Sequence, residues 1–207
     1  MKYSKTVLFS FFLLLSLYGC ASPAIRTGYL LDYDRLYKGK HLENYWANKS
    51  LINESKYSTI RIEPINIDRI LAQKGVTPDD CRRCVYDALR KEGEGSLQPH
   101  FVFDEQPDIA QVKLEIAITE MTPGSAVGRI FAGELGLGHA WIQVEGKVVD
   151  LKRIEEIAAF SDRRRSSGAI GLRDLGKDSG PILVCELLKQ IAADIIYELK
   201  ESFSFRK

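Results

Sequence analysis

The sequence has 207 residues, of which 45% are hydrophobic and 28% are charged, and its formal net charge is +1. These fractions are typical of an ordinary globular domain, and the length is sufficient for one domain with a hydrophobic core. The nearly neutral charge excludes the broad basic surface that nucleic-acid binding requires.

Residues 1–19 have the parts of a secretory signal peptide: two lysines, an apolar stretch too short to span a membrane, and a small residue at the end. The stretch closes on Leu17-Tyr18-Gly19-Cys20, which resembles a bacterial lipobox, although Tyr18 replaces the small residue usual there. In a lipobox the cysteine thiol takes a lipid, because it is nucleophilic enough near neutral pH, and then becomes the new N-terminus. We therefore expect Cys20 to be lipidated. The alternatives are an ordinary signal peptide with an incidental cysteine, or a short anchor helix.

The expected lipid also predicts a location. Two or more acyl chains on Cys20 make a stable membrane anchor. Ala21 follows the cysteine, and by resemblance to Gram-negative lipoproteins a residue other than Asp there favours export to the outer membrane. Residues 20–28 form a tether that reaches at most about 30 Å when fully extended. We expect the domain to lie close to the periplasmic leaflet of the outer membrane.

Residues 29–55 form an aromatic N-terminal arm. Tyr29, Tyr33, Tyr45 and Trp46 favour two interpretations. The rings form a patch that contacts a partner or the membrane interface, since Tyr and Trp are common in both settings. Alternatively, they pack on the domain itself.

Residues 56–201 are predicted to form a single α+β domain, followed by a frayed tail at 202–207. A first strand lies within 56–68, where Pro64 indicates an edge or a bulge. The sequence Thr77-Pro78-Asp79-Asp80 predicts a helix start, with a capping Thr, a proline at the first helical position and acids near the positive end of the dipole. This helix should end near Glu92.

Further strands are predicted from alternating or short apolar runs at 101–103, 111–119 and 140–150. Residues 151–160 fit either a helix or a strand. Residues 161–180 are polar and long for a loop in a compact domain, which favours mobility or function there. The last helix begins at Pro181, and its apolar stripe contains Cys185, Leu188, Ile191, Ala192, Ile195 and Leu199.

Three blocks of the chain carry a family resemblance. They are Gly28-Tyr29-Leu30-Leu31-Asp32-Tyr33 with Leu36, the segment Tyr57 to Asp68, and Gly138 to Asp150 continuing to Arg164. Together they resemble a family of bacterial lipoproteins known as domain of unknown function 3313. The resemblance implies no catalytic residues, and it favours a turn and a strand at 151–160.

The resulting order of elements is similar to the N-terminal domain of TolB and to outer-membrane lipoproteins that activate peptidoglycan synthases. The expected fold is a mixed, mostly antiparallel sheet of about five strands with two helices packed on one face. Fold analogy of this kind cannot establish function.

Cys81-Arg82-Arg83-Cys84 is the sharpest chemical motif, because arginines between two cysteines could lower a thiol pKa. In thiol oxidoreductases, however, the first cysteine lies at the helix N-terminus, whereas both cysteines here lie within the predicted helix on its apolar stripe. Two buried thiols or a structural disulfide are the alternatives, since the envelope is oxidising. A bridge from either cysteine to Cys185 also stays open.

Other candidate sites are weaker. His41, His100 and His139 lack metal-ligand spacing to the cysteines, and we expect no metal and no cofactor. Gly133, Gly136 and Gly138 precede a strand, so they indicate a hairpin rather than a phosphate loop. Arg163, Arg164 and Arg165 form a basic cluster in a predicted loop, where they either contact lipid headgroups or an acidic partner, or are simply solvated.

The sequence thus favours an outer-membrane-anchored periplasmic lipoprotein that is a non-enzymatic binding or accessory module of an envelope complex. It leaves the partner and the oligomeric state open. The alternatives are a thiol oxidoreductase using Cys81 and Cys84, or a homo-oligomeric outer-membrane assembly protein.

Overall fold

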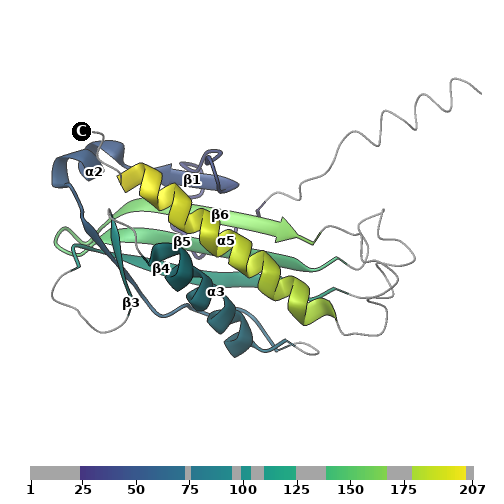
Figure 1. The fold of residues 1–207 in the computed structure, drawn as a ribbon. Helices are drawn as coiled ribbons and strands as arrows, with labels where there is room; N and C mark the ends of the chain where they lie inside the picture. The colour runs from purple at the N-terminus through teal and green to yellow at the C-terminus, as the bar shows by residue number, and fades with distance from the viewer. Residues whose placement is uncertain are drawn as a thin grey trace, which may run out of the picture.

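The computed structural model describes residues 24–72, 76–94, 99–103, 110–124, 139–166 and 179–203. Within these residues one mixed sheet has the strand order β1-β6-β5-β4-β2-β3 (Figure 1). β1, β6, β5 and β4 are antiparallel neighbours, whereas β2 is parallel to both β4 and β3. The strands are β1 Asn44–Ala47, β2 Thr59–Ile62, β3 His100–Phe103, β4 Val112–Thr122, β5 Trp141–Asp150 and β6 Glu155–Arg165.

The sheet therefore has six strands rather than the expected five. The additional strand, β1, lies in the aromatic segment that the sequence assigned to an arm outside the domain. It pairs with β6 along Asn44 to Ala47. The strand predicted within 56–68 is confined to β2, which ends before Pro64, since a proline cannot donate to the sheet.

Two helices, α3 Pro78–Gly93 and α5 Ser179–Phe203, lie side by side across one face of the sheet, as expected (Figure 1). α3 begins with a capping box in which Thr77 accepts from the Asp80 N–H and Asp80 accepts from the Thr77 N–H. α5 continues to Phe203, which is 0% exposed. Ser202 and Phe203, which the sequence assigned to a frayed tail, therefore belong to the helix. A short third helix, α2 Lys49–Ser55, follows β1 and was not predicted.

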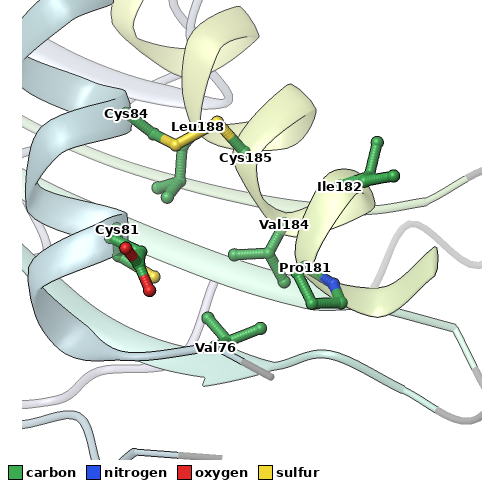
Figure 2. A pocket seen from close by; sticks show the side chains of 9 residues that line it. Val76, Cys81, Cys84, Pro181, Ile182, Val184, Cys185 and Leu188 are labelled. Atoms are coloured by element: carbon green, nitrogen blue, oxygen red, sulfur yellow. A yellow bond between two sulfur atoms is a disulfide. The ribbon is translucent and has the colours of Figure 1, made fainter. Parts of the chain in front are cut away.

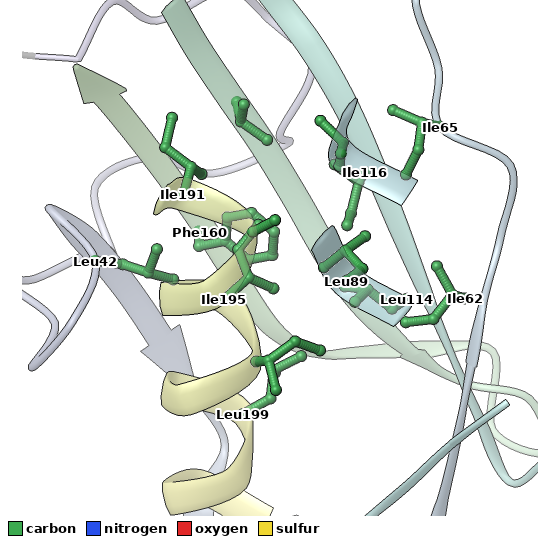
Figure 3. Close-up of a cluster of buried hydrophobic side chains, with 14 of the residues drawn as sticks. Leu42, Ile62, Ile65, Leu89, Leu114, Ile116, Phe160, Ile191, Ile195 and Leu199 are labelled. Carbon is green, nitrogen blue, oxygen red and sulfur yellow. The ribbon is translucent and has the colours of Figure 1, made fainter. Parts of the chain in front are cut away.

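The hydrophobic core lies between the sheet and these two helices. Figure 3 shows Ile191, Ile195 and Leu199 along α5, with Phe160 of β6 beside Ile195 and Leu89 of α3 next to Leu114 of β4. Phe160 fits here because its strand neighbour across the ladder is Gly146, which has no side chain. Burying these large side chains contributes roughly 25 cal/mol per Å² of apolar surface and supplies most of the driving force for folding.

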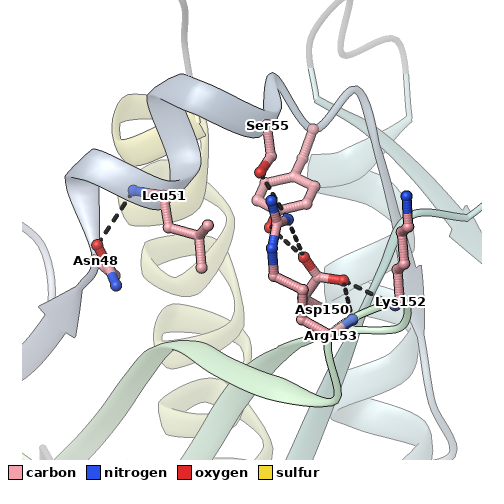
Figure 4. Close-up of polar contacts among 7 residues, drawn as sticks. Asn48, Leu51, Ser55, Asp150, Lys152 and Arg153 are labelled. Carbon is pink, nitrogen blue, oxygen red and sulfur yellow. Dashed lines mark hydrogen bonds and ion pairs between the residues drawn. The ribbon is translucent and has the colours of Figure 1, made fainter.

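β5 and β6 are joined by a turn at residues 151–154, so the ambiguous 151–160 segment is a turn and a strand. The Asp150 carboxylate accepts the N–H groups of Lys152 at 2.7 Å and Arg153 at 2.9 Å (Figure 4). Arg153 also donates to Ser55 at the end of α2, at 2.9 Å. The turn is thereby attached to α2, at the end of the sheet opposite to the start of α5 (Figure 1).

The other end of the sheet, which we call the Trp141 end, is where β4 and β6 end and where β5, at Trp141, and α5 begin (Figure 1). Ile25 meets the sheet near this end, at Gln143.

Candidate functional site

Polar side chains occupy the face of the sheet opposite to α3 and α5. Side chains alternate along a strand, so where Ile142 and Val144 of β5 enter the core, Gln143 and Glu145 point to the other face. Residues 24–35, which we call the N-terminal strap, cross this polar face. Gln143 and Glu145 are consequently 0% exposed. We treat the polar face and the strap over it as the candidate site.

The strap is held by hydrogen bonds to β5. The Ile25 N–H donates to Gln143 Oε1 at 2.8 Å, and Gln143 Nε2 donates to the Ile25 carbonyl at 2.6 Å. Thr27 Oγ1 and the Tyr33 hydroxyl donate to Glu145 Oε2 at 2.9 Å and 2.8 Å. Gln143 Nε2 also donates to Glu145 Oε1 at 2.6 Å. Glu145 therefore acts as the buried acceptor that fixes the strap, because a buried carboxylate is tolerated only when it is well hydrogen-bonded.

Tyr33 organises the turn of the strap. Its hydroxyl oxygen accepts the backbone N–H groups of Gly28, Tyr29 and Leu30 at 3.1, 3.2 and 3.3 Å, while its proton goes to Glu145. Burial, and then the nearby carboxylates of Glu115 and Glu145, raise the pKa of Tyr29 to about 12. The side chains of Tyr29 and Tyr33 thus both contact residues of this chain.

The remaining aromatic residues of the predicted patch are also engaged. Tyr45 is 2% exposed in the core, which excludes it as a surface contact. The Arg35 guanidinium lies 4.0 Å from the centre of the Trp46 ring and forms an ion pair with Glu156. The four aromatic residues therefore all pack against residues of this chain, and Tyr29, Tyr33 and Trp46 stay partly exposed. Two apolar side chains of the strap reach solvent: Leu31 is 92% exposed and Ile25 is 48% exposed.

The three consecutive arginines do not form a loop cluster, because they lie in β6 and the strand turns them to alternate faces. Arg163 donates to Glu120 at 3.0 and 2.9 Å on the polar face. Arg164 points to the helix side and pairs with Asp162 at 2.6 Å and with Asp194 of α5 at 2.7 Å. Arg165 is exposed.

The cysteines take a structural arrangement. Cys84 of α3 and Cys185 of α5 form a disulfide between the two helices, which is one of the pairings that the sequence left open (Figure 2). Cys81 is 1% exposed, and its thiol donates to the Met121 sulfur at 3.1 Å. Burial, and then the Asp80 carboxylate, raise the pKa of this thiol to about 11. This arrangement does not match the hypothesis of a Cys81–Cys84 redox pair, which needs an accessible thiolate.

An apolar cavity of about 260 Å³ lies beside this disulfide (Figure 2). Its walls are mainly aliphatic, with Val76, Val184 and Leu188 among them. The charged residue in its wall, Asp80, has its carboxylate engaged with the Thr77 hydroxyl at 2.7 Å. The cavity therefore offers shape and apolar surface but little to orient a polar ligand.

The histidines have separate surroundings. His139 Nδ1 lies 2.6 Å from the Ser166 carbonyl oxygen, and His41 Nε2 lies 3.2 Å from Glu201 Oε1. In the described ranges, no group of three or more His, Cys, Asp or Glu side chains is placed to hold a metal ion. No helix of those ranges is both long enough and apolar enough to cross a bilayer. The lipobox and Gly133, Gly136 and Gly138 lie outside the described residues.

Sequence reasoning missed Gln143 and Glu145. Their alternation with Ile142 and Val144 indicates a polar face, and this signal was available in the sequence. The strap that covers them was not predictable, because the Ile25 contact joins residues 118 positions apart.

Comparisons with known proteins leave the family open. No family model matches the chain, so the expected membership in domain of unknown function 3313 is not confirmed. No curated protein matches its sequence.

Three solved structures show a distant likeness. The PelC dodecamer from Paraburkholderia phytofirmans has a TM-score of 0.38 and 14% identity over 65% of this chain and 89% of its own. Protein XCC0632 from Xanthomonas campestris, of family DUF330, has a TM-score of 0.41 and 12% identity over 69% of this chain and 82% of its own. Lipoprotein GNA1162 from Neisseria meningitidis has a TM-score of 0.33 and 12% identity over 65% of this chain and 98% of its own. These values are too low to carry an argument about this chain, and TolB is not among the three.

Proposed function

We propose that this chain is an outer-membrane-anchored periplasmic lipoprotein that acts as a non-enzymatic binding or accessory module of an envelope complex. The lipid on Cys20 anchors it to the periplasmic leaflet, and the outer side of the strap over the polar face presents a surface to an envelope protein.

The observation that carries the proposal is the position of the strap. Ile25 is hydrogen-bonded in both directions to Gln143 at 2.8 and 2.6 Å, so the folded domain begins almost immediately after Cys20. The five residues from Cys20 to Ala24 reach at most about 18 Å when fully extended. A lipid on Cys20 would therefore hold the domain against the bilayer surface, where partners in the same membrane are close.

The buried carboxylates support a binding role rather than catalysis. Glu145 accepts donors from the strap, and Glu198 accepts the N–H groups of His41 at 2.6 Å and Leu42 at 3.3 Å. Asp150 organises the β5–β6 turn. Each of these groups stabilises the fold, and catalysis would need a carboxylate that can reach a substrate.

Lipidation is tested by mass spectrometry of the N-terminal peptide of the full chain extracted from membranes of a Gram-negative host. We expect a peptide that begins at Cys20 and carries a diacylglyceryl group. The variant Cys20→Ser should lack this modification and should be recovered in the soluble fraction. An unmodified Cys20 in wild-type protein would contradict the anchor.

The binding role is tested by photo-crosslinking in living cells. A photoreactive amino acid replaces Leu31, which is 92% exposed on the strap, and in a matched variant it replaces Ile154, which is 86% exposed in the β5–β6 turn. We expect one envelope protein to be captured from position 31 and not from position 154. Capture of only a second copy of this chain would favour the homo-oligomeric alternative, and equal yields at both positions would contradict a specific face.

A further inference from the structure

Trp141 lies at the end of the sheet where β5 begins, and two arginines contact its ring. It is the first residue of β5, and its ladder partner in β6 is Arg165. The guanidinium carbons of Arg163 and Arg165 lie 4.7 and 5.9 Å from the centre of its ring. These contacts hold the indole in one orientation on the polar face, because a cation is attracted to the face of an aromatic ring.

The two arginines differ in charge balance. Arg163 donates two hydrogen bonds to Glu120, so its charge is neutralised within the protein. Arg165 is exposed, and no carboxylate of the described residues lies within ion-pair distance of it. Arg165 therefore presents a positive charge outward beside a large ring that is polar at one edge.

The position of Trp141 and Arg165 relative to Cys20 determines which surface these two side chains can contact. Ile25 is bonded to Gln143, two residues along β5 from Trp141, which is about 7 Å. The five residues from Cys20 to Ala24 span at most about 18 Å. Any membrane that holds a lipid on Cys20 is thus within reach of the Trp141 end, whereas the β5–β6 turn lies at the opposite end of the sheet.

We propose that Trp141 and Arg165 form a contact surface for an anionic phospholipid bilayer, with the indole in the interfacial layer and the guanidinium on lipid phosphate. This inference rests on the proposed lipid anchor and adds an orientation to it. Trp is favoured in the interfacial layer because its ring is apolar and its N–H is polar. The planar guanidinium matches the geometry of phosphate oxygens, and an anionic surface attracts it.

The test uses the lipidated full chain, reconstituted into vesicles of phosphatidylethanolamine and phosphatidylglycerol with or without brominated phospholipid. Bromine quenches tryptophan fluorescence at short range. Trp46 is a built-in control, because it pairs with Ala159, six positions along β6 from Arg165, or about 20 Å from Trp141 along the strand. We expect quenching in Trp46→Phe, where Trp141 remains, and its loss in Trp141→Phe, where Trp46 remains.

A second pair of variants tests the charge. In the Trp46→Phe background, Arg165→Gln should reduce the quenching of Trp141, whereas Lys152→Gln, at the exposed turn at the opposite end of the sheet, should leave it unchanged. Equal quenching of Trp46 and Trp141, or a blue-shifted Trp141 that bromine does not quench, would overturn the inference.

Flotation of the vesicles and the mass of the Cys20 peptide separate the possible failures. If lipidated protein floats with the vesicles but bromine does not quench Trp141, the lipid anchor is supported and the contact surface is contradicted. If Cys20 carries no lipid, both proposals are contradicted.

Discussion

At the scale of a single residue, Gly146 shows how closely the core is packed. A Cβ at this position would lie 2.3 Å from Phe160 Cζ and 2.8 Å from the Glu115 carbonyl oxygen. We predict that Gly146→Ala lowers the free energy of unfolding by about 1–3 kcal/mol, because overpacking forces the ring or the strand to move. Urea unfolding measures this. Thr122→Ala, at the exposed end of β4, is the control and should change the free energy by less than about 0.5 kcal/mol. An unchanged midpoint in Gly146→Ala would show that Phe160 can move aside at no cost.

Asp150 should make the free energy of unfolding sensitive to acid. Burial alone would raise its pKa, but hydrogen bonds from Tyr57, Arg153 and Lys152 outweigh burial and hold the pKa at about 2. Because this value lies below that of an unfolded Asp, the ionised carboxylate stabilises the fold above about pH 4, and this contribution is lost as the pH falls toward 2.

The expected contribution is about 2 kcal/mol. Unfolding measured between pH 5 and pH 2, which spans these pKa values, should show this loss in wild type, and Asp150→Asn should remove most of that dependence. The control is Asp87→Asn, at an exposed position of α3, which should keep the wild-type slope. A slope in Asp150→Asn equal to that of wild type would assign the acid sensitivity to other groups.

At the scale of an element, the strap should depend on one hydroxyl. The Tyr33 hydroxyl accepts three N–H groups from residues 28–30 and donates to Glu145 at 2.8 Å. We predict that Tyr33→Phe speeds amide hydrogen exchange at residues 28–30 several-fold or more, because each lost bond removes about 1 kcal/mol of local protection. Amides of β5 should keep wild-type rates. Tyr37→Phe is the matched control, since the Tyr37 ring is 49% exposed. Unchanged exchange in Tyr33→Phe would mean that Ile25 and Thr27 hold the strap alone.

The elements that were predictable are those whose signal is local. The capping box at Thr77 and the alternation along β4 depend on residues a few positions apart, and both elements lie where the sequence indicates them. β1 was missed because its partner is β6, and a four-residue strand has no clear pattern of its own. The sequence indicates a loop at the end of β6, because the buried Asp162 and the half-buried Arg164 are typical loop residues until Asp194 of α5 is placed beside Arg164.

At the scale of the whole molecule, the structure joins the strap, residues 24–35, to the sheet. The polar face would otherwise expose Gln143 and Glu145 to water, and the strap buries both. The folded part of the described chain therefore includes residues 24–28, which the sequence assigned to the tether, and the proposed lipid on Cys20 would connect to it over fewer than nine residues. A short tether favours contact with the membrane, because the effective concentration of a tethered surface falls as the linker lengthens.

We predict that the length of the tether controls the contact of Trp141 with the bilayer. Inserting a flexible Gly/Ser segment between residues 22 and 23 leaves Cys20 and the strap intact. An insertion of about 20 residues adds an average reach of roughly 25 Å, which lets the domain leave the surface. We expect bromolipid quenching of Trp141 to decrease with the longer insertion and to change less with one of about five residues. Flotation should be unaffected, because the lipid is unchanged. Quenching that stays constant at both lengths would mean that Trp141 and Arg165 bind the bilayer strongly enough without the tether, and that the short connection serves the partner rather than the lipid.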